Sequence, residues 1–444
     1  LVFYITGDNG ASGEGTVNGA WSAPSFQNGR PEDPEWLLER MDDFGSANCE
    51  NHYNYPWAWA LDSPFQWMKQ VASHFGGTRN AMAVSWPKRI LDAGGLRPQF
   101  HHVVDVAPTI FDACGITPPS RVNGIDQMEV HGTSMLYSFD DEHADDQHET
   151  QYFEMMGNRG VYHRGWMASC FHGRPPWIRW EGVPFDGEQE RWELYDLRSD
   201  YSQAVDVAAK YPDKLEELKQ VFDREARRNN VYPMRDPGSG SQQAAPVPTS
   251  LNGATRMTYT AAHVRMPEFS VVNIKNASWR ATAVIEIPDA VDAARGVIAC
   301  QGGNMAGWSL YLSESGVPTF HYNWYGHEHT SVAAPSPLGA GRHVVDMLFA
   351  YDGGFAAGGD VSLAVDGVVV ATGRVPNTVP VIFSMSGETF DVGIDTGAPV
   401  GPYPHQFPCT ARIEGVTIER LGERPADVEA AMREGLIRAG LASQ

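Results

Sequence analysis

The sequence lacks the features of membrane and disulfide-rich proteins. Its 444 residues contain no apolar run near the ~18 residues that a membrane-spanning helix needs. Its five cysteines are odd in number and lack the spacing of metal-binding motifs, which argues against a disulfide framework and favours a reducing compartment. We therefore expect a globular cytoplasmic protein that does not contact a membrane. A periplasmic location is the alternative.

Positive charge is also scarce. Lysine and arginine total 33 residues against 55 aspartates and glutamates, which gives a formal net charge of −22. This much negative charge repels the phosphates of nucleic acids and of anionic lipids. Nucleic acid is therefore not an expected partner, and an anionic substrate would need a locally positive site.

The sequence also starts without a methionine or a basic leader segment. Residues 1–6 are apolar and typical of a buried strand in a parallel sheet. A chain rarely begins with such a strand, so we expect a C-terminal fragment of a longer protein.

Composition and hydrophobic pattern divide the chain into five segments. We expect the C-terminal part of an α/β domain over 1–112, a small α+β subdomain with an antiparallel sheet over 113–235, a linker over 236–255, an all-β sandwich over 256–422, and a C-terminal helix or tail over 423–444. The linker is rich in proline, glycine and serine. In the sandwich, Val361, Leu363 and Val365 alternate with other residues before a hairpin turn at Asp366-Gly367.

Individual elements follow from local patterns. We predict strands at 1–6, 81–86, 152–155, 160–163 and 192–195, an amphipathic stretch at 67–74 and a helix over 102–115. A second helix begins at Pro212, and its residues Leu218, Phe222 and Ala226 recur on one face.

Asp8 and Asn9 are candidate metal ligands. They follow the first strand, at the edge where open α/β sheets place their ligands. A carboxylate beside an amide carbonyl offers hard oxygen ligands, which suit Ca²⁺, or alternatively Mg²⁺. A plain Asp-Asn-Gly turn is the competing interpretation.

Lys69 is a candidate anion-binding residue. Its ammonium group follows several aromatic residues and precedes Gly76-Gly77, where a backbone without side chains would let a ligand approach closely. A surface lysine on a helix is the competing interpretation.

Together these motifs resemble the sulfatases, a family with the alkaline-phosphatase-like fold. The resemblance rests on the phrases Gly7-Asp8-Asn9-Gly10-Ala11-Ser12-Gly13-Glu14-Gly15 and Ala72-Ser73-His74-Phe75-Gly76-Gly77-Thr78-Arg79-Asn80, and on Asp105-Val106-Ala107-Pro108-Thr109. They look like a bacterial arylsulfatase subgroup that carries an added C-terminal β-sandwich. The resemblance covers almost the whole chain and is most specific in 1–110.

The resemblance implies roles for these residues. Asp8 and Asn9 would bind calcium, Lys69 would bind the sulfate group, and His74 would contact it or the leaving group. The substrate would be a small sulfate ester. Tyr53, Tyr55, Trp57, Trp59 and Trp67 could line a cleft for its aromatic group, and an aromatic core under a long loop is the competing interpretation. The full-length protein would need a formylglycine-generating enzyme as a partner.

One departure from the family is decisive. Sulfatases use a formylglycine nucleophile made within a Cys/Ser-x-Pro-x-Arg motif, and the sequence has none, since the residues after Cys114 have the wrong spacing. No catalytic residue is therefore expected in this chain, and alone it should be inactive.

Other functions remain open. A phosphodiester or phosphonate monoester hydrolase of the same superfamily would bind a similar tetrahedral anion. A glycan-binding protein would use the sandwich, with Trp308, Tyr322, Trp324 and Tyr325 as an aromatic platform. An inactive homologue is a further alternative.

Overall fold

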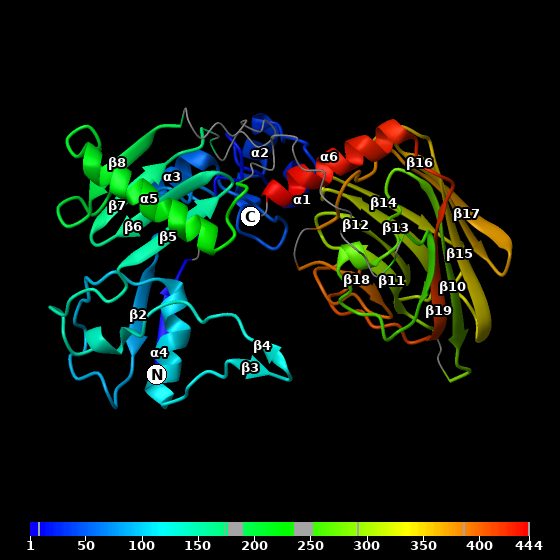
Figure 1. Ribbon diagram of the computed structural model, residues 1–444. Helices are drawn as coiled ribbons and strands as arrows, with labels where there is room; N and C mark the ends of the chain where they lie inside the picture. Colours follow the sequence, from blue (N-terminus) through cyan, green and yellow to red (C-terminus); the bar gives the residue numbers. More distant parts are fainter. Residues whose placement is uncertain are drawn as a thin grey trace. The chain divides into compact units, whose positions relative to one another are not determined.

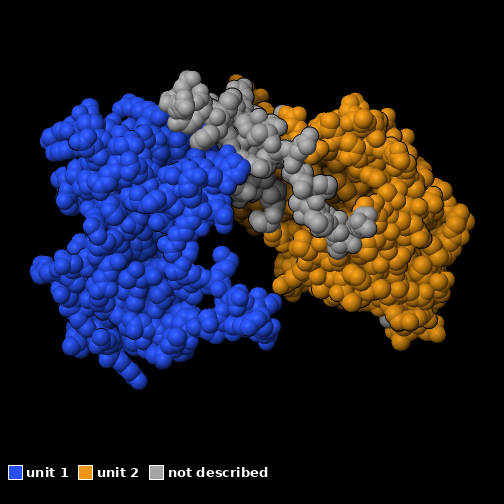
Figure 2. All heavy atoms as spheres, viewed as in Figure 1, with its two compact units in different colours: residues 1–13, 55–241 blue, residues 14–54, 242–444 orange. Residues whose placement is uncertain are grey.

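The computed structural model describes residues 1–7, 9–173, 175, 190–234, 251, 253–290, 293–384 and 387–442. The chain forms two compact units, one of residues 1–13 and 55–241 and one of residues 14–54 and 242–444 (Figures 1 and 2). Most of the linker expected at 236–255 lies outside the described residues. No helix in the described ranges has the length and apolar character to span a bilayer.

The first unit contains short helices and small sheets. Its helices are α3 (Tyr55–Asp62), η2 (Phe75–Gly77), η3 (Val103–Asp105), α4 (Val106–Cys114), η4 (Met135–Ser138) and α5 (Pro212–Arg228). Its strands are β1 (Val2–Thr6), β2 (Ala81–Ser85), β3 (Arg121–Val122), β4 (Ile125–Asp126), β5 (Thr150–Met155), β6 (Asn158–His163), β7 (Trp166–Cys170) and β8 (Trp192–Asp196). The predicted helix over 102–115 is confirmed as η3 and α4, whereas 67–74 is not helical.

The first strand is present but is not buried in a parallel sheet. β1 pairs only with β2, in antiparallel orientation. Val2 and Tyr4 are 61% and 68% exposed. The expectation of a buried parallel strand is therefore wrong for this structure, because a two-stranded ribbon leaves much of its side chains open to solvent.

The four-stranded sheet is a compact layer in which each strand pairs with the next, in the order β5-β6-β7-β8. Helix α5 covers it through Leu218, Phe222 and Ala226, all buried against Val161 and Leu194. These are the positions that the helical spacing predicts. The sheet is confirmed, with β7 as a strand that the pattern alone did not indicate.

The second unit is an antiparallel sandwich. Its strands are β9 (Arg256–Tyr259), β10 (Ser278–Ile287), β11 (Gly296–Gly302), β12 (Gly307–Leu312), β13 (Pro318–Trp324), β14 (Glu328–Ala333), β15 (Gly341–Tyr351), β16 (Gly359–Val365), β17 (Val368–Val375), β18 (Phe390–Val392) and β19 (Arg412–Leu421). They form a six-stranded sheet, β17-β16-β15-β10-β19-β9, and a five-stranded sheet, β14-β13-β12-β11-β18. The helices of the unit are α1 (Ala23–Gln27), α2 (Pro34–Glu39), η1 (Met41–Asp43), η6 (Glu268–Ser270) and α6 (Ala426–Ala442).

The core of the sandwich follows from alternation along its strands. Every second residue of β10, from Trp279 to Ile287, is buried between the sheets. The predicted hairpin is confirmed: β16 ends at Val365, and Asp366 and Gly367 both have positive φ before β17 begins. The tail also forms the expected helix, α6, which buries Val428 and Met432.

Residues 14–54 differ from the predicted division, because they belong with the sandwich instead of with the rest of 1–112. Arg30 stacks over Trp324 at 3.9 Å, and Trp36 stacks on His327 with ring centroids 4.2 Å apart. Asn28 Nδ2 donates to the Ile382 carbonyl at 2.8 Å. These partners lie far away in sequence, so local composition could not reveal the attachment.

The structure overturns the aromatic platform suggested for glycan binding. Trp308, Tyr322 and Tyr325 are at most 5% exposed and pack in the core of the sandwich. Trp324 is covered by the Arg30 guanidinium. These rings fill the protein interior and do not present an open face to a sugar.

Candidate active site

The two principal motifs of the sequence meet in the first unit. The Lys69 amide donates to the Ala11 carbonyl at 3.1 Å, so the segment after Asn9 lies against the segment that carries Lys69. Gly10 has φ +83°, and a β-carbon there would lie 1.9 Å from the Gly76 carbonyl oxygen. Asn9 and Lys69 are both half-buried. Asp8 lies outside the described residues.

Helix α3 helps to fix this turn. Both carboxylate oxygens of Asp62, its last residue, accept from the Ala11 amide, at 3.0 and 3.1 Å. Burial raises the pKa of Asp62, and the hydrogen bond from Ala11 partly opposes that rise. The contact between Asp62 and Ala11 ties the end of α3 to the turn that carries Asn9.

The loop that carries Lys69 is strained on both sides of the lysine. Trp67 and Gln70 have φ of 68° and 79°, a left-handed conformation that costs a non-glycine residue free energy. A β-carbon at Gly76 would lie 2.2 Å from the Trp67 carbonyl oxygen. The glycine thus permits a close approach of the chain to itself, where we had expected close approach of a ligand.

Side chains from the four-stranded sheet and from the segment after it hold this loop through hydrogen bonds. The Gln203 side chain accepts from the Phe75 amide at 2.7 Å and donates to Ser169 Oγ on β7 at 3.0 Å. Asn158 Nδ2, on β6, donates to the Gln70 carbonyl at 3.2 Å. The subdomain after the α/β segment therefore sets the conformation around Lys69. Gln203, Ser169 and Asn158 could not be recognised as partners from sequence, because they belong to no motif and lie far from the loop along the chain.

His74 is part of the same attachment. It is 1% exposed, its Nδ1 lies 2.9 Å from Ser73 Oγ, and its Nε2 lies 3.1 Å from Glu193 Oε2 on β8. Tyr195 also donates to Glu193 Oε2, at 2.8 Å. The hydrogen bond from His74 lowers the pKa of Glu193. Both ring nitrogens are engaged, which leaves neither for a sulfate oxygen in this arrangement.

Aromatic side chains lie next to the lysine loop. Trp67 stacks on Phe171 with ring centroids 4.1 Å apart, and its centroid is 5.2 Å from that of Trp59 on α3. Trp57 is 63% exposed. Tyr53 belongs to the other unit, so the structure does not gather all five predicted aromatics into one group.

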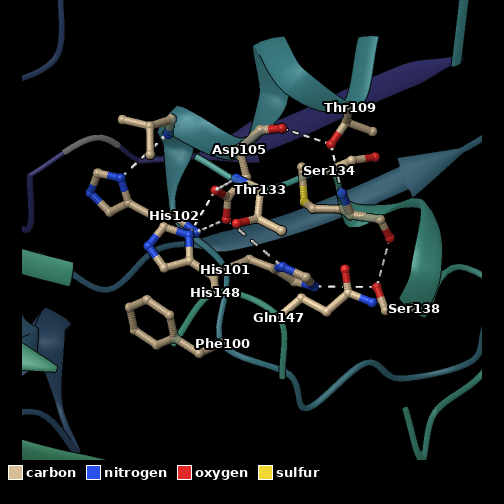
Figure 3. Close-up of polar contacts among 12 residues, drawn as sticks. Phe100, His101, His102, Asp105, Thr109, Thr133, Ser134, Ser138, Gln147 and His148 are labelled. Carbon is tan, nitrogen blue, oxygen red and sulfur yellow. Dashed lines mark hydrogen bonds and ion pairs between the residues drawn. The ribbon is translucent and has the colours of Figure 1, made fainter. Parts of the chain in front are cut away.

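The Asp105 motif forms a buried structural hub (Figure 3). Asp105 is fully buried and accepts from the amides of His102 and Thr133, both at 2.8 Å, while His148 Nδ1 lies 2.7 Å from its Oδ1. Thr109 donates to the Asp105 carbonyl at 2.6 Å. The His102 side chain caps η3. His148 had no recognisable signal in the sequence.

The electrostatics of the hub favour a charged pair. Burial raises the pKa of Asp105, but the hydrogen bonds from His148 and from the two amides outweigh it and lower the pKa below its usual value. Burial lowers the pKa of His148, but the bond to Asp105 outweighs it and raises the pKa. The pair therefore links α4 with the segment that precedes β5.

The donor chemistry at the turn fits a hard cation in part. Asn9 offers an amide oxygen beside the carboxylate of Asp8, and Ca²⁺ takes ~6–8 oxygen ligands. These two side chains make only part of such a cage, and the other ligands would have to come from elsewhere.

Comparison with known proteins agrees with the motifs. No family model matches the chain. An "uncharacterized sulfatase" of Schizosaccharomyces pombe is 26% identical over 226 residues, which are 50% of this chain and 37% of that protein. The chain thus covers well under half of the length of this relative.

Similarity to solved structures is weak. A protein in complex with "its substrate D-Glucosamine-2-N, 6-O-disulfate" matches 35% of this chain and 29% of its own, with 19% identity and a TM-score of 0.26. The CBM40 of Ruminococcus gnavus IT-sialidase, bound to α2,3 sialyllactose, matches 40% of this chain and 97% of its own, with 12% identity and a TM-score of 0.28. These scores are too low to establish a shared fold. In sequence, however, this chain is similar to a sulfatase across 50% of its length.

Proposed function

We propose that this chain is part of an arylsulfatase, which hydrolyses a sulfate ester to sulfate and an alcohol or phenol. The observation that carries the proposal is the contact between the turn after Asn9 and the loop of Lys69, where the Lys69 amide bonds to Ala11. Two motifs that resemble sulfatase motifs, and that are distant in sequence, are thereby adjacent. The sequence similarity to a sulfatase supports the same assignment.

In this proposal Asp8 and Asn9 hold a calcium ion, with magnesium as the alternative. Such an ion would withdraw negative charge from the sulfate oxygens as the ester bond breaks. The Lys69 ammonium holds another sulfate oxygen, and its charge stabilises the transition state more than the ground state. The strained backbone around Lys69 would be retained because it directs the ammonium at the substrate.

The remaining residues act by positioning. Glu193 fixes His74, and Gln203 fixes Phe75, so the lysine loop cannot relax when the substrate leaves. Trp59 and Trp67 offer an apolar surface for an aromatic leaving group. The formylglycine nucleophile has no counterpart among the 444 residues, so turnover requires a protein segment that supplies it.

Lys69→Ala in the full-length protein tests the proposal. We expect kcat/KM for 4-nitrophenyl sulfate to fall about 10²–10³-fold, the usual effect of removing one charge-stabilising donor. Lys88→Ala, an exposed lysine outside the loop, is the matched control and should leave the rate unchanged. Equal rates for the two variants would refute the role of Lys69.

Metal binding has a readout that does not depend on turnover. Calcium should protect residues 9–11 of the wild type from hydrogen exchange, and Asp8→Ala should abolish this protection. Protection of residues 9–11 that persists in Asp8→Ala, or that calcium does not produce in the wild type, would contradict the assignment. A preference for a phosphonate monoester over the sulfate ester would favour the phosphoester hydrolase.

A further inference from the structure

The outer face of the five-stranded sheet, in the unit that does not carry Lys69, has a row of buried polar side chains. Asp391 on β18 is the cross-strand partner of Cys300 on β11, and Cys300 is the partner of Ser309 on β12. Each of the three residues is at most 1% exposed. Tyr403 packs over this face in a small apolar cluster with Cys300.

Three donors in this row come close enough to hold one ion. The Cys300 sulfur, a carboxylate oxygen of Asp391 and a carboxylate oxygen of Asp395 all lie within 4.8 Å of one another. Asp395 is 1% exposed. A metal ion at their centre would be within reach of one thiol and two carboxylates.

The charge of this cluster is not balanced by the protein. Asp391 Oδ2 accepts from the Thr396 hydroxyl at 2.7 Å, and Asp395 Oδ2 accepts from the Tyr403 hydroxyl at 2.8 Å. These are neutral donors. In the part of the chain that the structure describes, neither aspartate forms an ion pair with a lysine, arginine or histidine. Two adjacent buried carboxylates without a counter-charge are costly.

A separate sign of a ligand comes from Ser309. Its side chain is fully buried, and its Oγ forms no hydrogen bond of ordinary geometry within the described ranges, although the Tyr403 hydroxyl lies near it. Because Ser309 lies opposite Cys300 in an antiparallel pair, both side chains project from the same face of the sheet. A buried hydroxyl without a partner costs free energy unless another group satisfies it.

We propose that Asp391, Asp395 and Ser309 bind a divalent cation inside the sandwich, with Cys300 selecting the metal. Zinc would take the thiolate as a ligand and release the thiol proton. Calcium would use oxygen ligands only and leave the thiol protonated. In either case the ion neutralises the two carboxylates, supplies a partner for Ser309 and fastens the segment after β18 to the sheet.

The test uses the full chain, stripped of metal with a chelator and then given Zn²⁺ or Ca²⁺ alone. Hydrogen exchange resolved by peptide is the readout, because it separates this site from the turn at Asn9. We expect bound metal to slow exchange at least tenfold in residues 296–302 and 390–400. Asp395→Asn should remove this protection, whereas Asp360→Asn, an exposed carboxylate on the other sheet, should retain it.

Cys300→Ser distinguishes the two kinds of ligation. If calcium still protects these residues in the variant and zinc does not, oxygen ligands are sufficient to bind the ion. If zinc alone protects the wild type and Cys300→Ser removes that protection, the thiolate is a ligand. The wild-type measurement decides the proposal even if a variant does not fold. If neither metal protects 296–302 and 390–400, the proposal is wrong. Protection confined to residues 9–11 would also overturn it while supporting the proposed active site.

Discussion

The sandwich unit and the lysine loop of the first unit are stabilised in different ways. In the sandwich, alternate residues of β10 and the facing strands share one continuous apolar core, so the free energy of folding is distributed over many side chains. Lys69 lies outside the helices and strands of its unit, and its strained loop is held by hydrogen bonds in which Gln203 accepts from the Phe75 amide and Glu193 accepts from the His74 ring. Loss of a large core side chain therefore destabilises the whole sandwich, whereas loss of one loop contact should loosen the loop alone.

The largest effect should come from the sandwich core. Trp308→Ala removes a fully buried indole that packs on Trp279, and we expect it to lower the free energy of unfolding by about 3–5 kcal/mol. Tyr4→Ala, on the exposed β1, should change it by no more than about 0.5 kcal/mol. Urea unfolding measures both. A large decrease in the free energy of unfolding of Tyr4→Ala would mean that β1 is covered in solution, so that the first unit too would depend on a buried strand there.

A smaller effect should follow from loss of one loop contact. Gln203→Ala leaves the Phe75 amide without its acceptor, which should cost about 1–3 kcal/mol. The cost should appear as faster hydrogen exchange in residues 65–79, with the sandwich peptides unaffected. Gln220→Ala, an exposed glutamine on α5, is the control. Unchanged exchange in the loop would show that other contacts suffice to hold it.

The smallest effect concerns pH. The pKa of His148 is raised, so its contribution to stability is present below its unfolded pKa and is lost as the pH rises through its folded pKa. The pKa of Asp105 is lowered, so its contribution is lost only as the pH falls through the folded pKa of Asp105. The wild type should therefore exceed His148→Gln in stability by about 1 kcal/mol at pH 6 and by less at pH 9. His101 and His102 have lowered pKa values and oppose this trend, but they are present in both proteins.

Patterns within a segment predicted much of the fold. The alternation around Val361 and Leu363 and the Asp366-Gly367 turn located a hairpin, and the spacing of Leu218 and Phe222 located α5 and its buried face. The burial of β1 was predicted wrongly, because apolar residues indicate a strand but not which layer, if any, covers it. The attachment of residues 14–54 was missed, because Arg30 and Trp324 are brought together only by the fold.

The candidate site was predictable only in its motifs. Asn9 and Lys69 could be named from sequence because their neighbours resemble a known family, and the roles of Asp8, Asn9 and Lys69 stay predictions. Gln203, Glu193 and Asn158 position the loop but have no local pattern, since a hydrogen-bond partner distant in sequence leaves no trace in spacing. For the same reason His74 was expected to face the substrate, although it is buried against Glu193.

The attachment of residues 14–54 to the sandwich also affects biosynthesis. This segment leaves the ribosome well before its folding partner, which starts at residue 242. At ~5–20 residues per second, Trp21 and Trp36 would wait roughly 13–57 s for Met305, which packs in the same cluster. During this interval the apolar side chains of residues 14–54, such as Trp21 and Leu37, remain uncovered, although the residues on both sides in sequence belong to a unit that can already fold. Chaperones that bind apolar segments should therefore engage this protein at 14–54, and a chain that stops before the sandwich should aggregate through the same residues.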